Sequence, residues 1–218
     1  MTFPFPIVDT LSSALPSVVY NTSSSVDAGA TTYSFSGLSI GTAATTRLVV
    51  CAFMGRASSR TGGSATFGGV SATKIVEQIA SGGYHTQSMW AAVVPTGTTA
   101  TCSITWSGSQ GTCFVHCWSL YDLTSSTSTA TNSSTATAPS PNLNLLTGDV
   151  LVLSASTNSS TTSTPTGYTE SYDATQPGAA VVQQTAGNHV ATSNESPRTL
   201  TTTFGAASFQ IGIAAAWR

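Results

Sequence analysis

The end of this chain alternates apolar residues with polar or small ones, and this period of two constrains the fold more than any other feature. Every second position from 209 to 217 is apolar: Phe209, Ile211, Ile213, Ala215 and Trp217. Successive side chains of a β-strand point to opposite faces, so the run predicts a half-buried strand. A strand that ends on the last residues is normally tied into a sheet.

The same period, or a short apolar run, marks strands along the rest of the chain. Residues 48–54 are apolar throughout, which predicts a central strand covered on both faces. Gly68-Gly69 is typical of a tight antiparallel turn, and residues 107–111, with two glycines, predict another hairpin. The other predicted strands span residues 31–36, 64–67, 70–78, 85–94, 101–106, 112–121, 149–156, 168–172, 179–185 and 198–204.

The composition disfavours helices. Charged residues make up 6% of the chain, with Lys74 as its single lysine, whereas serine and threonine make up about a third. Exposed helices rely on charged pairs four residues apart, which this chain cannot supply. A net charge of −2 without a basic cluster argues against nucleic acid as a partner, because binding phosphates needs several basic side chains on one face. No apolar run reaches the roughly 20 residues that cross a membrane as a helix.

These observations predict an all-β fold: a two-sheet antiparallel sandwich and, among sandwiches, a jelly roll. The Ser/Thr-rich tracts at residues 124–141 and 158–165 contain few apolar residues, so they are interpreted as long loops or solvated edges. The strands on both sides of these tracts need each other to close two sheets. We therefore expect a single β-sandwich domain over residues 21–218.

The first 20 residues are expected to form an extended N-terminal arm. Pro4, Pro6 and Pro16 favour extended backbone there. The arm could lie on a neighbouring subunit or form an edge strand of its own domain, and both alternatives stay open. The N-terminus lacks the basic and apolar regions of a secretory signal, so folding in a reducing cytoplasm is expected. The alternative is that an export signal has been removed.

The four cysteines are interpreted first as buried thiols that pack as small hydrophobic side chains. Cys113 and Cys117 share one face of their predicted strand and His116 points to the other, so no metal site is predicted. If residues 107–111 formed a hairpin, Cys102 would lie opposite Cys117. A disulfide between Cys102 and Cys117 is therefore a second hypothesis, although a reducing cytoplasm argues against it.

Trp90, Tyr168 and Tyr172 are candidates for stacking against a sugar ring, although aromatic residues that alternate along strands more often belong to a core. Residues 37–41 match the pattern of a nucleophilic serine on a sharp turn, but a strand rather than a helix follows them. No carboxylates are paired by the sequence as glycosidase chemistry would need. We predict no catalytic residue, cofactor or metal, and expect that the protein is not an enzyme.

Several different short motifs occur one after another along most of the chain beyond residue 30. They are Gly37-Leu38-Ser39-Ile40-Gly41, Arg47-Leu48-Val49-Val50, Phe67-Gly68-Gly69-Val70-Ser71-Ala72-Thr73, Trp90-Ala91-Ala92-Val93-Val94-Pro95-Thr96-Gly97, Trp118-Ser119-Leu120 and Ala206-Ala207-Ser208-Phe209. With them the chain resembles the jelly-roll-like sandwich domains of tailed-bacteriophage virion proteins, which serve as head decorations, head fibres and tail appendages. The resemblance implies a structural role, with no catalytic residues to carry over.

The resulting expectation is a bacteriophage virion structural protein, either a capsid decoration or cement protein or a head-fibre component. Its partners would be the capsid shell or other virion structural proteins, and copies of itself in a homo-oligomer, with a trimer favoured. It would fold in the host cytoplasm and lie on the virion surface, which agrees with a surface wetted by hydroxyl groups. The alternatives are a carbohydrate-binding receptor module of a tail fibre, which would bind a surface glycan, and a small hydrolase domain.

Overall fold

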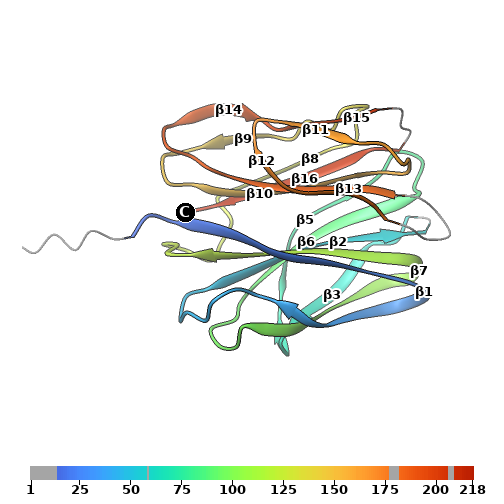
Figure 1. Cartoon of the computed structure of the whole chain (residues 1–218), viewed down its shortest axis with the longest axis horizontal. Helices are drawn as coiled ribbons and strands as arrows, with labels where there is room; N and C mark the ends of the chain where they lie inside the picture. Colours follow the sequence, from blue (N-terminus) through green and yellow to red (C-terminus); the bar gives the residue numbers. More distant parts are fainter. Residues whose placement is uncertain (1–13, 58, 177–181, 206–208) are drawn as a thin grey trace, which may run out of the picture.

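Antiparallel β-strands form all the regular structure in this computed structural model, which describes residues 14–57, 59–176, 182–205 and 209–218 (Figure 1). Sixteen strands and no helix lie in these ranges. The predicted all-β antiparallel fold is therefore confirmed. The strand order does not establish a jelly roll, which stays a prediction.

The first seven strands form one sheet in the order β4-β3-β7-β2-β6-β5, with β1 paired along β7. Their bounds are β1 Ser17–Ser39, β2 Leu48–Arg56, β3 Gly62–Phe67, β4 Val70–Ser71, β5 Thr73–Ile79, β6 His85–Val93 and β7 Thr99–Tyr121. Of the predicted N-terminal arm, residues 1–13 lie outside the described residues, and residues 17–20 form the start of β1.

Strands β1 and β7 are each 23 residues long and bend together, so the sheet folds over on itself. The first part of β7, up to Trp106, pairs with β3, whereas its last part, from Thr112, pairs with β2. β1 follows both parts and shifts in register on either side of Ala30. On the far side, the backbone N–H of Gly62 in β3 donates a 2.6 Å hydrogen bond to Glu77 Oε2 in β5.

The hairpin predicted at residues 107–111 is wrong, because β7 runs through them without reversing. Glycines in this stretch let other groups approach the strand closely, as glycine within a strand often does. A Cβ atom on Gly108 would lie 2.8 Å from Arg60 Nε, and one on Gly111 would lie 3.2 Å from the Arg56 carbonyl oxygen. The glycines that suggested a turn therefore mark a bend against packed neighbours.

The remaining strands form a five-stranded sheet, in the order β12-β13-β10-β16-β8, and two ribbons, β11-β15 and β14-β9. Their bounds are β8 Ala130–Ser134, β9 Asn142–Leu145, β10 Val150–Thr157, β11 Ser163–Thr166, β12 Thr169–Gln176, β13 Val182–Val190, β14 Glu195–Thr199, β15 Thr201–Phe204 and β16 Ile211–Trp217. The two Ser/Thr-rich tracts contribute β8, an edge strand of this sheet, and part of β11.

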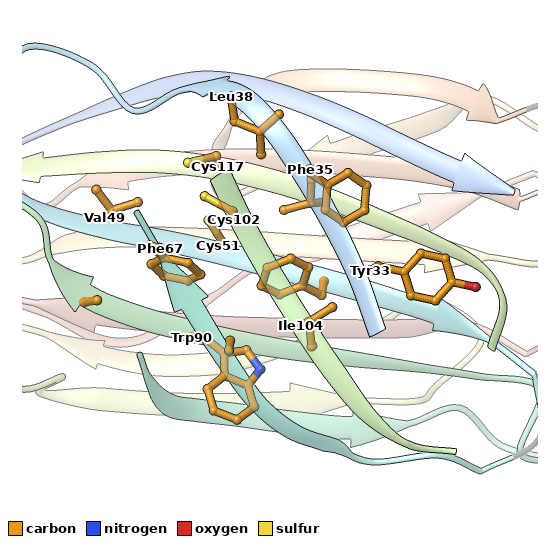
Figure 2. Close-up of a cluster of buried hydrophobic side chains, with 14 of the residues drawn as sticks. Tyr33, Phe35, Leu38, Val49, Cys51, Phe67, Trp90, Cys102, Ile104 and Cys117 are labelled. Carbon is orange, nitrogen blue, oxygen red and sulfur yellow. The ribbon is translucent and has the colours of Figure 1, made fainter. Parts of the chain in front are cut away.

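These layers enclose three hydrophobic cores. The first lies inside the folded seven-stranded sheet and includes Phe53, Phe67 and Ile104 (Figure 2). The second lies between the two large sheets and includes Trp118 and Trp217. The third lies between the five-stranded sheet and the two ribbons, and Figure 1 shows the ribbons as an outer layer over that sheet.

Strands β2, β10 and β16 each take part in two cores. In β2, Val49 and Cys51 face the first core whereas Val50 faces the second, so the strand predicted to be covered on both faces is confirmed. β16 differs from its prediction, because its small residues are buried as well. Ala214 and Ala216 lie in the third core, beneath the ribbons. The alternation along β16 therefore reflects the size of the side chains, because the residues on both faces of the strand are buried.

Arg47 joins two loops at one end of the folded sheet. Its side chain is completely buried, and its guanidinium donates four hydrogen bonds of 2.8–2.9 Å to the carbonyl oxygens of Gly41, Val94, Thr96 and Gly97. Gly41 has a φ of +73°, which favours glycine. A buried guanidinium is stable only when its donors are satisfied, so Arg47 holds the loops before β2 and after β6 in one arrangement.

We expect Arg47→Met to lower the free energy of unfolding by about 3–5 kcal/mol, because four buried or partly buried carbonyl oxygens lose a charged donor. Urea denaturation followed by tryptophan fluorescence measures this change. Arg60→Met, at an exposed arginine, is the matched control and should change stability by less than about 0.5 kcal/mol. Equal effects of the two substitutions would contradict this role of Arg47.

Candidate functional site

The three residues considered for sugar stacking lie apart in the structure. Trp90 is 4% exposed in the first core, where its Nε1 donates a 2.8 Å hydrogen bond to Ser88 Oγ. Tyr168 lies in the third core, and its hydroxyl is 2.8 Å from Thr202 Oγ1. Tyr172 packs at the edge of the second core. A stacking platform needs aromatic faces side by side at the surface, and these residues do not form one.

Three cysteines gather in the first core. Figure 2 shows Cys51, Cys102 and Cys117 side by side, with Cys102 coming from the opposite part of the folded sheet. Cys51 and Cys117 are paired neighbours on β2 and β7. All four cysteines are free thiols in this structure, and burial raises the pKa of Cys51 and raises that of Cys113 to about 12. Cys102 and Cys117 are near each other because β7 bends, not because of the predicted hairpin.

We expect the folded protein to resist alkylation by iodoacetamide, because all four thiols are fully buried. The protein denatured in urea without a reductant should gain four carbamidomethyl groups by mass spectrometry. A gain of two groups, rising to four after reduction, would instead show a disulfide such as Cys102–Cys117. Rapid labelling of the folded protein would contradict the burial.

One half of the interface between the two large sheets is polar. Gln87 Nε2 reaches across it to Ser154 Oγ and Ser156 Oγ, at 3.3 and 3.0 Å. His116 Nδ1 lies 3.1 Å from the Tyr20 hydroxyl, with aromatic rings packed around it. Both ring nitrogens of His85 are buried without a hydrogen-bond partner among the described residues. This half of the interface therefore stabilises the contact less than the apolar half.

Burial keeps both histidines neutral. It lowers the pKa of His116 to about 3 and, with the nearby positive charge of Arg56, lowers that of His85 to about 4. The unfolded chain binds protons on both histidines at higher pH than the folded one does. Their effect on stability is therefore fully favourable above about pH 6.5 and is lost as pH falls toward the folded values.

We expect the free energy of unfolding to fall by about 4 kcal/mol between pH 7.5 and pH 5, about 2 kcal/mol for each histidine. In His116→Gln the drop should be about half as large, even if the variant is less stable at every pH. Urea denaturation at both pH values measures the difference for each protein. An unchanged drop in this variant would contradict the assignment to His116.

Most charged side chains are bound within the fold. Hydrogen bonds or ion pairs hold ten of the thirteen charged side chains in the described residues: Asp27, Arg47, Lys74, Glu77, Asp149, Glu170, Asp173, Glu195, Arg198 and Arg218. Many of them join segments far apart in sequence, as Arg218 does when its Nε donates to Asp149 Oδ1 at 2.9 Å. Carboxylates in such contacts are poorly placed to act as catalytic acids or bases.

One cluster resembles a catalytic arrangement only in composition. Glu195 Oε1 lies 3.0 Å from His189 Nε2, and Glu195 Oε2 accepts a 2.7 Å bond from Arg198 Nη1. Burial would raise the pKa of Glu195, but Arg198 and His189 outweigh it and hold this pKa below its usual range. Both carboxylate oxygens face cationic or donor groups, so the cluster ties β14 to β13. The sequence did not indicate it, because only the fold brings β13 beside residue 195.

Three hollows follow one end of the seven-stranded sheet, where β1, β2 and β5 begin and β6 and β7 end. Their volumes are about 380, 210 and 320 Å³ in order from β1 to β5. The first is lined by Ser17, Val19, residues 41–44, Tyr121 and Asp122; the second by Thr45, Thr46, Val93 and residues 123–126; the third by Leu48, Ser71, residues 73–75, 91–93 and 126–128. Val93 and Ser126 line both the second and the third.

Exposed apolar side chains gather along these hollows. Val19 is 47% exposed and Val93 is 39% exposed, and both line a hollow. Leu15 and Val70, two more of the six large apolar residues exposed in the described chain, lie within two residues of a lining residue. The rest of the lining is mostly Ser, Thr and Ala, with Asp122 at one end and Lys74 at the other. Such a surface suits contact with another polypeptide.

The hollows lack the groups of a metal or catalytic centre. Neither histidine nor cysteine lines them, and no group of three or more potential metal ligands occurs anywhere in the described residues. The described chain also contains no helix long and apolar enough to cross a membrane. Comparisons with protein-family models, curated proteins and solved structures found no match. The candidate functional site therefore consists of the three hollows and the exposed apolar side chains along them.

Proposed function

We propose that this chain is a structural component of a bacteriophage virion, either a capsid decoration or cement protein or a head-fibre component that binds the capsid shell. The observation that carries the proposal is the position of the few charged side chains. Most charged side chains are held in contacts within the fold, and Glu195 joins a ribbon to the five-stranded sheet through His189, whereas serine and threonine supply most of the remaining polar residues. Such a surface suits a rigid building block better than a catalyst.

The resemblance to virion sandwich domains supports the proposal through the core. Leu38, Leu48, Phe67, Trp90 and Trp118, which belong to the shared motifs, are all buried. The large side chains of the motifs therefore reflect a way of packing strands, whereas Val70 and Val93 of the same motifs are exposed along the hollows. The alternative of a carbohydrate-binding receptor module loses its proposed platform, because the aromatic residues that suggested it lie in different cores.

Co-assembly of this chain with the capsid shell tests the proposal. This chain, with an affinity tag, is produced together with the capsid protein encoded in the same genome, and particles are separated on a density gradient. We expect the tagged chain to sediment with the shells at a constant ratio, and electron microscopy with gold-labelled antibody should place it on their outer face. The chain produced alone, which should stay at the top of the gradient, is the control.

Three results would overturn the proposal. Failure of the chain to sediment with the shells or with any other virion structure would exclude a structural role in that particle. Specific binding on a glycan array, together with absence from the head, would favour the receptor module of a tail fibre instead. Turnover of an ester or glycoside substrate would favour the hydrolase.

A further inference from the structure

The three hollows at the end of the seven-stranded sheet lie beside the point where the chain enters the fold. β1 begins at Ser17, which lines the first hollow, and Leu15 just before it is 79% exposed. The backbone that leads into β1 thus starts at the surface. Thirteen residues precede Ala14, and fully extended they would reach about 43 Å.

The sequence of these thirteen residues is complementary to the hollows. Phe3, Phe5 and Ile7 stand at every second position, so in extended backbone they share one face, and Pro4 and Pro6 between them favour that backbone. Asp9 is the only charged residue in the segment. The hollows offer exposed valines and small hydroxyl side chains, with one charge at each end. An apolar segment with little charge is matched to this lining.

The dimensions agree as well. From β1 to β5 the end of the sheet crosses β7, β2 and β6, which is four steps between neighbouring strands, or about 19 Å. An extended segment of six residues spans about 20 Å. Residues 2–8, which contain the alternating apolar residues, are therefore long enough to cross the three hollows, with residues left over to reach from one subunit to the next.

We propose that residues 1–13 of one copy of this chain bind in the three hollows of a second copy and join the two. Leu15 is 79% exposed, so the segment leaves its own subunit at the surface, from which it can reach a neighbouring copy. The contact joins two different surfaces, so its repetition gives a ring where the rotation between copies closes and an open filament where it does not. A trimer would be one such ring. The inference does not depend on which particle, if any, the protein enters.

Cross-linking between distinguishable subunits tests the proposal. A tagged chain with Phe5→Cys and an untagged chain with Thr45→Cys, at an exposed residue of the middle hollow, are produced together and treated with a short bis-maleimide. The native cysteines are buried and should not react. We expect a product that joins tagged to untagged chains. Leu146→Cys replaces Thr45→Cys in the control, because Leu146 is 48% exposed and lines none of the three hollows.

Three outcomes would overturn the proposal. The first is a yield with Thr45→Cys no higher than with Leu146→Cys. The second is cross-linking within a single chain in the Phe5→Cys, Thr45→Cys double variant, which would place the segment on its own subunit. The third comes from analytical ultracentrifugation, where the unaltered protein should be oligomeric. Val93→Asp should weaken this association about tenfold or more, whereas Leu146→Asp should not. The contact would be excluded if the unaltered protein were monomeric, or if the two substitutions weakened the association equally.

Discussion

The burial of the central strands on both faces is the constraint on which the rest of this structure depends. β2 in one large sheet and β10 and β16 in the other each contribute side chains to two cores. A strand covered on both faces has no position for an unpaired charge, because burying such a charge costs several kcal/mol. The low charge content of the chain follows from stacking its layers in this way, and so does the choice of alanine and glycine on the second face of β16.

Several of the few charged side chains lie where layers and loops meet. Arg47 fixes the loops at one end, Glu77 bridges the two sides of the folded sheet, and Arg218 binds Asp149 beside β10. Each of these contacts joins segments that are distant in sequence. Each also fixes the direction and distance between two groups, which an apolar contact would not do. The polar half of the inter-sheet interface, with His85 and His116 held neutral, is where the same burial makes the fold sensitive to acid.

The strands could be predicted from the sequence because their pattern is local. Residues 48–54 and 209–217 carry their strand signal in the spacing of apolar residues, and the structure has β2 over the first range and β16 over residues 211–217 of the second. The bend of β7 could not be predicted, since the glycines near residue 108 are equally typical of a turn. Nor could the hollows, because residues 41–46, 93 and 122–128 meet only after the sheet has formed. The exposure of Trp90, Tyr168 and Tyr172 could not be predicted either, because the packing of the layers determines which aromatic side chains are buried.

The shared core between the two large sheets predicts that the described strands unfold as one unit, although each sheet also covers a core of its own. Differential scanning calorimetry of the full chain tests this most directly. If the shared core couples the layers, unfolding will be a single transition whose calorimetric enthalpy equals its van't Hoff enthalpy. Two separable transitions, one for the seven-stranded sheet and one for the five-stranded sheet with its ribbons, would contradict it.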